Sequence, residues 1–440
     1  MTPNKPTIVV GLNELNIEFI KQYVADGRLP HFRQLLDNND IVVTQSEAEY
    51  ALLEPWIQWV TIHTGKTYAE HQVYRLGDIV ERPELAQIYE DLENAGHSVG
   101  AVSPFNAANR LKDPHFFVPD PWTDTPASGT PLLKALSLAV HQAVNDNAKS
   151  KISMASVLSI VKSVIRYVPP PQYLTYAKLI LGAKKPGRKA VILDTLLADT
   201  FLSLFKKHRT DFSTLFLNTG AHLQHHYMFN SAAYKGSLKN PEWYCPSSCD
   251  PLLDILEVYD SVLGALQKQN INLIVLTGLH QEPHEHNTYY WRLNDHAAFL
   301  KAIGITSTFS VDTRMSRDFL MRFDNTEDCL QAEHILTSVI DTTYNERVFS
   351  VDNRGASLFV ELTFAQDITP GATVMCQKTQ QTVNSFADHV SFVAIKNGEH
   401  HGDGYLIANF PHTIDKRIPL TSVRDIIFST VKDGAVATPS

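Results

Sequence analysis

The apolar residues of this chain form short continuous runs that alternate with segments of helical spacing. Such runs are typical of strands buried on both faces of a parallel sheet. They cover Thr7–Leu12, Asp40–Thr44, His97–Ser103, Ser213–Asn218 and Asn272–Thr277. Between two of them, Pro251–Gln267 repeats its apolar residues at helical spacing. This alternation predicts an α/β fold with a mainly parallel sheet sandwiched by helices.

Two segments depart from the alternation. Residues 131–208 contain four helix-like stretches and no strand pattern, which predicts an all-helical insertion that caps the site or mediates oligomerisation. From about residue 345, short β-type runs separated by turn residues dominate. We therefore expect a first core part, the insertion, a second core part, a β-rich part that completes the core and site, and a tail. Their ranges are 1–130, 131–208, 209–345, 346–432 and 433–440.

The composition restricts the class of protein and its partners. The chain has 440 residues, 44% of them hydrophobic and 19% charged, which is typical of globular proteins. Its net charge of −9 argues against a nucleic-acid partner. Four cysteines are too few for a disulfide scaffold and favour a reducing compartment. The first residues lack the pattern of a signal peptide, and no apolar stretch is long enough to span a membrane. We expect a soluble, cytoplasmic protein.

Histidines gather where predicted strands end. The chain has 19, and three of them, His222, His225 and His226, directly follow the strand ending at Asn218. If a helix begins there, His222 and His226 share a face, as paired histidines of helical zinc sites do. Surface histidines on an ordinary helix are the alternative. The cluster favours a metal site, because imidazole is a usual ligand of zinc.

Two further segments bring histidines to the same kind of position. His280 follows the strand ending at Thr277 and is the histidine nearest to it. His400 and His401 lie in a glycine-flanked turn before another apolar run, and the spacing leaves open which of the two is a ligand. Three protein ligands plus a water is the usual arrangement of catalytic zinc.

Taken in order, these segments resemble the alkaline phosphatase superfamily, in particular its phosphodiesterase and nucleotide pyrophosphatase branch. A strand leads into Asn13-Glu14 where the family has an aspartate ligand. The family's nucleophile segment, a Ser or Thr followed by a Thr-Gly step, is resembled by Glu54–Gln72. The family's remaining histidine motifs are matched in order by His222–His226, Gly278–Gln281 and His400 before Gly404.

The resemblance implies a two-metal enzyme, but several positions depart from it. Asn13 and Leu279 replace aspartate ligands, and the nucleophile position falls on Pro55, which cannot attack a substrate. One metal site keeps three candidate ligands, His222, His226 and His400. We therefore expect a single divalent cation per chain, most consistent with zinc because its ligands are nitrogen atoms.

The function that follows is a metal-dependent hydrolase acting on a phosphate, sulfate or phosphonate ester or diester. Metal-bound water would attack the substrate directly. Glu54 would act as general base, while Asn13 and His280 would stabilise the developing charge. The residues expected to bind the substrate, a small-molecule or glycan-linked ester, are Glu14, Trp56, Trp59 and His225.

Three alternatives stay open at the level of sequence. The missing nucleophile and aspartates also fit a catalytically inactive relative that binds a ligand or a partner protein, or an enzyme acting on a non-phosphoryl sugar substrate. Ile152–Val168 has the pattern of a basic amphipathic helix, which can lie on anionic lipid. Such a stripe more often packs on a core or on a dimer partner, so a homo-oligomer is favoured over membrane contact.

Overall fold

The computed structural model describes residues 5–145, 153–313 and 317–434. Contacts divide the chain into two compact units. Unit 1 comprises residues 1–283 and 398–440, and unit 2 comprises residues 284–397. Each unit has a hydrophobic core of its own. The chain thus leaves unit 1 once, forms unit 2, and returns to unit 1 for its last segment.

The centre of unit 1 is an eight-stranded sheet. β1 (Thr7–Leu12) pairs in parallel with β5 (Phe212–Leu217) on one side and with β6 (Asn272–Leu276) on the other. All three are buried along their whole length, as strands covered on both faces must be. The sheet order is β17–β2–β16–β6–β1–β5–β3–β4, the other strands being Arg417–Pro419, Ile41–Gln45, Asp403–Ala408, Val99–Val102 and Phe116–Val118.

β16 is the strand that runs against its neighbours. It pairs antiparallel with both β6 and β2, whereas the pairs on the β5 side of the sheet are parallel. The predicted fold class, a mainly parallel sheet sandwiched by helices, is confirmed. The antiparallel direction matters for function, because the start of β16 lies at the edge where β1, β5 and β6 end.

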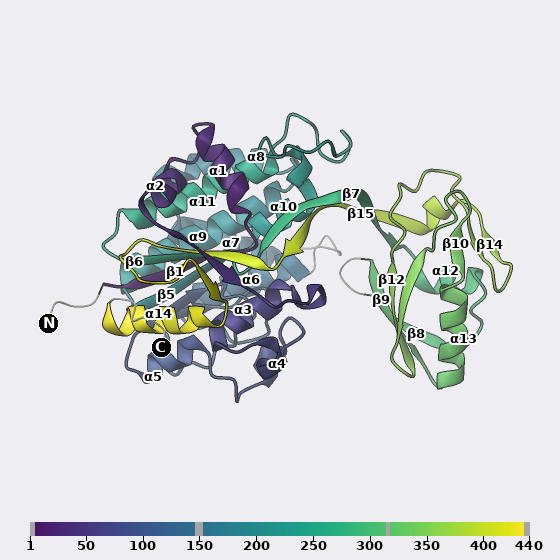
Figure 1. Cartoon of the computed structure of the whole chain (residues 1–440), viewed down its shortest axis with the longest axis horizontal. Coiled ribbons are helices and arrows are strands. Elements are labelled where there is room, and N and C mark those ends of the chain that lie inside the picture. The colour runs from purple at the N-terminus through teal and green to yellow at the C-terminus, as the bar shows by residue number, and fades with distance from the viewer. Residues whose placement is uncertain (1–4, 146–152, 314–316, 435–440) are drawn as a thin grey trace. The chain divides into compact units, whose positions relative to one another are not determined.

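Helices cover both faces of this sheet, as Figure 1 shows. Alternate residues of β1 point to opposite sides, so Ile8 and Val10 join one core cluster and Val9 joins the other. The first face is covered by α1 (Ile17–Ala25), α2 (Pro30–Asn38), α9 (Arg188–His208), α10 (Thr219–Tyr227) and α11 (Pro251–Gln267). The second is covered by α3 (Pro55–Thr64), α5 (Ile88–Asn94) and α14 (Ser422–Asp433).

The segment predicted as a helical insertion contains α6 (Pro131–Asn145), α7 (Met154–Tyr167), α8 (Tyr173–Leu181) and α9. α9 packs against β3 and β5, and its Phe201 is fully buried in the core of the first face. This helix therefore belongs to the sandwich itself. α6 and α7 pack mainly on each other, and residues 146–152 between them lie outside the described part of the chain.

Unit 2 is built mainly from antiparallel strands. β8 (Phe309–Thr313), β9 (Asp318–Phe323), β12 (Ser357–Leu362) and β11 (Phe349–Asn353) form one sheet. A smaller sheet joins β10 (Val339–Asp341), β13 (Val374–Cys376) and β14 (Thr382–Val383), and two helices, α12 (His296–Ala302) and α13 (Thr326–Leu336), accompany the sheets. The paired strands β7 (His280–Leu293) and β15 (Val390–His401) each contain one of the two chain crossings between units.

Among the described residues, no helix combines the length and the apolar character needed to cross a bilayer.

The remaining short helical elements of unit 1 are α4 (Tyr68–His71) and single 3₁₀ turns. The predicted tail begins inside the last turn of α14, and its residues from 435 onward lie outside the description.

Candidate metal centre

The candidate site lies at one edge of the unit 1 sheet. β1, β5 and β6 are parallel neighbours, so the residues that follow them emerge at the same edge. These are Glu14 after β1, α10 after β5, and His280 after β6. Since β16 runs antiparallel to β6, the turn before it brings His400 to that edge as well. Four segments distant in sequence therefore converge.

Glu14, His225 and His400 form the tightest group of ligand-type side chains at this edge. Oε2 of Glu14 lies 3.1 Å from Nε2 of His225 and 3.1 Å from Nε2 of His400. The two Nε2 atoms are 3.3 Å apart. The Glu14 side chain is only 2% exposed, whereas those of His400 and His225 are 14% and 31% exposed. A buried carboxylate thus contacts two imidazoles that are more exposed to solvent than it is.

The backbone holds Glu14 in an unusual conformation. Its φ is 58°, in the left-handed region that non-glycine residues rarely adopt. Three hydrogen bonds maintain it: the Glu14 N–H donates to the Thr277 carbonyl at 3.0 Å, and the Glu14 carbonyl accepts from the Gln281 N–H at 3.1 Å and from Nε2 of Gln224 at 2.7 Å. Backbone strain of this kind persists only where the surroundings over-determine it, as they do at functional sites.

The side chain of Glu14 is fixed as firmly as its backbone. Nδ2 of Asn13 donates to Oε1 at 2.9 Å, and Nε2 of Gln281 donates to Oε2. The other Nδ2 hydrogen of Asn13 goes to Oδ1 of Asn218 at 2.8 Å, while its Oδ1 accepts from the indole N–H of Trp59 at 2.8 Å. Asn13 is therefore fully used in orienting Glu14.

In both imidazoles, those of His225 and His400, the Nδ1 atom faces an oxygen atom of the protein. Nδ1 of His225 lies 3.4 Å from the carbonyl oxygen of Gly398, and Nδ1 of His400 lies 4.0 Å from Oε2 of Glu54. In metal sites, ligand histidines commonly direct their second nitrogen at a carbonyl or a carboxylate, which leaves the first nitrogen free to bind. In both residues Nε2 is the atom that faces Glu14.

The electrostatic surroundings shift the pKa values of the two carboxylates of the site, Glu14 and Glu54, in opposite directions. Burial alone would raise the pKa of Glu14, but the adjacent His400 and His225 outweigh it and hold that pKa far below its usual range. For Glu54, burial and the nearby Glu14 charge prevail over the attraction of His400 and raise the pKa to about 7. One carboxylate is thus held ionised, and the other is poised near neutrality.

The spacing of the three atoms suits a tetrahedral cation. Zinc bound at about 2.0–2.1 Å separates adjacent tetrahedral ligand atoms by roughly 3.3–3.4 Å. The distances of 3.1, 3.1 and 3.3 Å come within a few tenths of an ångström of this value. Two nitrogens and one carboxylate oxygen are also a common donor set of catalytic zinc. Glu14, His225 and His400 therefore fit a divalent cation.

This set differs from the predicted one. His222 and His226 do share a face of α10, with ring centroids 4.8 Å apart, but neither joins the group formed with His400. The inward face of α10 is marked instead by the buried Gln224, which bonds to Glu14, and by its neighbour His225. Helical spacing identified a pair of histidines, but it carried no information about which face turns towards the sheet edge.

The remaining predicted residues are distributed over this edge and behind it. Trp59 packs behind the site and bonds to Asn13. Trp56 faces elsewhere, since its indole N–H donates to the Tyr74 carbonyl at 2.9 Å. Pro55 is the first residue of α3, with Glu54 directly before it. No sequence pattern pointed to Gln224 and Gln281, which hold the ligands but are not themselves metal-ligating residue types.

The hydroxyl groups of the two nearby threonines, Thr61 and Thr64, each have a partner within their own part of the chain. Oγ1 of Thr61 lies 3.2 Å from Nε2 of His71, and Oγ1 of Thr64 donates to the Val60 carbonyl at 2.7 Å. Both threonines are buried within or beside α3. Their hydroxyl groups are therefore engaged in local structure.

A second group of ligand-type side chains contains His280, Glu282 and His401. Nε2 of His280 lies 3.5 Å from Oε1 of Glu282, and the imidazoles of His280 and His401 are 4.7 Å apart between centroids. His280 is buried, which lowers its pKa, whereas Glu282 and His401 are exposed. Nδ1 of His280 lies 2.6 Å from the carbonyl oxygen of Asp403.

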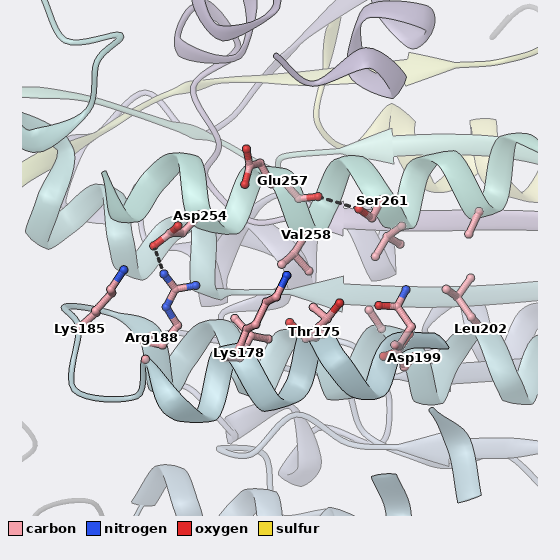
Figure 2. A pocket seen from close by; sticks show the side chains of 17 residues that line it. Thr175, Lys178, Lys185, Arg188, Asp199, Leu202, Asp254, Glu257, Val258 and Ser261 are labelled. Atoms are coloured by element: carbon pink, nitrogen blue, oxygen red, sulfur yellow. Dashed lines mark hydrogen bonds and ion pairs between the residues drawn. The ribbon is translucent and has the colours of Figure 1, made fainter. Parts of the chain in front are cut away.

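A cavity of about 420 Å³ lies elsewhere in unit 1, between α8, α9 and α11. Figure 2 shows Lys178 and Lys185 beside it, together with an ion pair between Arg188 and Asp254. Its carboxylates are already paired, and none of the candidate metal ligands lines it. This cavity is therefore separate from the candidate metal centre.

No protein-family model and no curated protein matches this chain. Solved structures do match it over nearly its whole length. Phosphonoacetate hydrolase from Sinorhizobium meliloti is 13% identical with a TM-score of 0.46, covering 98% of this chain and 96% of that chain. Human ectonucleotide pyrophosphatase/phosphodiesterase 5 is 11% identical with a TM-score of 0.45, covering 99% and 97%.

Alkaline phosphatase from the Antarctic bacterium TAB5 is 9% identical with a TM-score of 0.41, covering 98% of each chain. These proteins belong to the superfamily that the sequence motifs resemble.

Proposed function

We propose that this protein is a metal-dependent hydrolase of phosphate esters or diesters, or of the related sulfate and phosphonate esters. The observation that carries the proposal is the group formed by Glu14, His225 and His400, whose three ligand atoms lie within 3.3 Å of one another. A divalent cation held there would supply Lewis acidity towards a substrate oxygen. Nitrogen-rich ligation favours zinc over magnesium or calcium.

Glu54 is the residue best suited to proton transfer. Its carboxylate lies 4.0 Å from the outer nitrogen of His400, and its side chain is 34% exposed, so water can reach it. With a pKa of about 7, it can accept a proton from water near neutral pH. Glu54 would thus activate the water that attacks the substrate.

A one-step mechanism follows from the residues around Glu54. The position after it is a proline, and the hydroxyls of Thr61 and Thr64 are bonded within their own segment. No covalent ester of the chain is needed if water attacks directly. Asn13 acts as a positioning residue, since both hydrogens of its amide are already donated to Glu14 and Asn218.

The test is the metal content and the esterase activity of the purified full-length chain. We expect about one divalent cation per chain, and hydrolysis of at least one aryl phosphate monoester, phosphate diester, phosphonate ester or sulfate ester. Intact-mass spectrometry during turnover should detect no covalent adduct. An adduct on Thr61 or Thr64 would contradict the one-step mechanism.

In a second candidate function, the protein binds the metal but catalyses no hydrolysis. The absent nucleophile also fits a ligand-binding relative that performs no hydrolysis. A metal-loaded chain that binds a phosphate ester without hydrolysing it would favour this alternative. A chain that binds no metal at all would contradict both.

A further inference from the structure

Nine of the sixteen exposed large apolar side chains in the described part of the chain lie on just two helices, α7 and α8. A soluble protein seldom leaves such a contiguous set uncovered without a binding role. On α7 they are Met154, Val157, Leu158, Val161 and Ile165, and on α8 they are Tyr173, Leu174, Ile180 and Leu181.

The exposed residues of each helix form a stripe. On α7, positions 154, 157, 158, 161 and 165 recur at intervals of three and four residues, which places them on one face. The opposite face is turned inward by the buried Ser163 and Tyr167. The packing on a core that the sequence pattern favoured is present for Ile160 and Val164, whereas Ile165 is 67% exposed.

The two helices meet at their exposed sides. The hydroxyl of Tyr173, at the start of α8, lies 3.5 Å from the carbonyl oxygen of Ile165, near the end of α7. Both residues are exposed. α8 turns Tyr176 and Leu179 inward and leaves Leu174 and Leu181 at 72% and 87% exposure. The two stripes are therefore joined, and we call them together the α7–α8 face.

The charge of residues 153–193 indicates which kind of partner covers the α7–α8 face. Residues 153–193 contain seven lysines and arginines and no aspartate or glutamate, in a chain whose net charge is −9. The cations are Lys162, Arg166, Lys178, Lys184, Lys185, Arg188 and Lys189. Apolar side chains bordered by lysine and arginine are the pattern of helices that lie in the interface of an anionic membrane.

The same charges argue against a second copy of this chain. A two-fold dimer places the same patch of both subunits face to face. Lys162 and Arg166 of one copy would then approach those of the other, with no acidic residue in residues 153–193 to compensate. An anionic lipid surface both accepts the apolar side chains and neutralises the charge.

A recess beside α8 adds a place for a lipid headgroup. The cavity between α8, α9 and α11 is lined by Lys178 and Lys185, for which the described residues show no ion pair (Figure 2). Its carboxylates are occupied: Asp254 pairs with Arg188 at 2.6 Å, Glu257 pairs with Arg28, and Asp199 accepts from the Tyr176 hydroxyl at 2.9 Å. Lys178 remains available to a phosphate, whereas the charge of Lys185 also acts on Asp254.

We propose that the α7–α8 face binds the surface of membranes that contain anionic phospholipids. The helices would lie in the interface with their apolar stripes among the acyl chains and their lysines at the headgroups. This role is independent of the metal centre, so it stands or falls separately from the proposed hydrolase activity.

Co-sedimentation of the full-length protein with vesicles tests the proposal. We expect binding to phosphatidylcholine vesicles that contain phosphatidylglycerol and much weaker binding to phosphatidylcholine alone. Raising the salt concentration to about 1 M, where the Debye length falls to about 3 Å, should release most of the charge-dependent part. Absence of binding to the anionic vesicles at low salt overturns the proposal.

Paired variants separate charge from apolar contact. Lys162→Gln with Lys184→Gln should weaken binding roughly 30-fold, as expected from two lysines near an anionic surface. Ile165→Ser with Leu181→Ser should weaken it at least about tenfold, because two aliphatic side chains no longer enter the interface. All four side chains are exposed, so the melting temperature should stay within a few degrees of that of the wild type.

Matched controls come from other exposed positions. Lys239→Gln with Lys301→Gln, and Leu330→Ser, alter the same residue types outside the α7–α8 face and should leave vesicle binding unchanged. Equal losses in controls and test variants would overturn the assignment of the face. So would a dimer in solution that Ile165→Ser with Leu181→Ser converts to a monomer while vesicle binding is absent.

Discussion

Two groups of ligand-type side chains lie at the same sheet edge, and the adjacent residues His400 and His401 belong to different ones. In the group of Glu14, the carboxylate is 2% exposed and is held by amides on both oxygens. In the group of His280, the carboxylate of Glu282 is 53% exposed. One group is organised before any cation arrives, and the other would have to order an exposed side chain to bind one.

The proton positions of the two groups differ as well. In the first, the outer nitrogens of His225 and His400 face a carbonyl and a carboxylate, which leaves Nε2 as the binding atom. In the second, Nδ1 of His401 accepts the N–H of Asp403 at 3.2 Å, so a neutral His401 carries its proton on Nε2. The comparison teaches that proximity of ligand-type residues is not sufficient, and that the partners behind them decide which group can hold a metal.

The largest effect should come from removing the central carboxylate. Glu14→Gln keeps the shape but loses the charge that joins the two imidazoles. Loss of an outer partner of a metal ligand typically costs roughly 10–100-fold in metal affinity, and loss of the ligand itself should cost more. Elemental analysis of the purified variant should find no bound metal. An activity assay should find hydrolysis abolished. Glu282→Gln is the matched control and should keep its metal. If Glu282→Gln lost the metal and Glu14→Gln kept it, the group of His280, Glu282 and His401 would be the metal centre.

The adjacent histidines give the sharpest contrast. His400→Ala should reduce the bound metal and the activity, because it removes one of three ligands. His401→Ala should leave both close to the wild-type level. Metal content and turnover measured side by side for the two variants decide the matter. A loss confined to His401→Ala would show that the second group is the metal centre.

Glu54 should affect the reaction more strongly than it affects metal binding. General-base assistance is typically worth about 10² to 10⁴ in rate, so Glu54→Gln should lower turnover by that order. Its metal affinity should fall by at most about 10–100-fold, the cost of losing an outer partner, since Glu54 touches the cluster only through the outer nitrogen of His400. Full activity in the glutamine variant would remove Glu54 from the mechanism.

The smallest expected effect is on stability. A ligand present at 100 times its Kd stabilises the folded state by about 2.7 kcal/mol. A chelator should therefore lower the melting temperature of the wild type by about 5–11 °C, on the scale of 2–4 °C per kcal/mol for domains of 150–250 residues. Differential scanning calorimetry should show the same decrease for His401→Ala. For His400→Ala the chelator should have little effect, and a full decrease there would contradict the assignment.

Much of the fold followed from the sequence because its signals are local. The run Thr7–Leu12 is buried on both faces, as a continuous apolar strand must be, and it forms the centre of the sheet. The helix Pro251–Gln267 has the predicted bounds, since Asp250 caps its start and a proline occupies its first position. Ser357–Leu362 is likewise a strand at the predicted residues.

The candidate site was predictable only as a region. Sequence placed Glu14, the histidines of 222–226, His280 and His400 after or before strands, and a parallel sheet delivers such residues to one edge. Which of them meet depends on the rotation of α10 about its axis. That rotation is set by packing of buried residues such as Leu223 and Gln224 against distant segments, and a 3.6-residue period contains no information about it.

The sequence by itself determined the strands, most helices, the charge of residues 153–193 and the edge of the sheet at which chemistry gathers. These follow from the local periodicity of apolar residues and from composition. Only the tertiary structure decided that His225 joins Glu14, that His400 and not His401 faces it, and that the α7 stripe stays exposed. Gly398 illustrates the reason: a Cβ there would lie 2.2 Å from Oε1 of Gln281 and 3.0 Å from the Gln224 carbonyl. Such close approaches between segments far apart in the chain depend on three-dimensional packing.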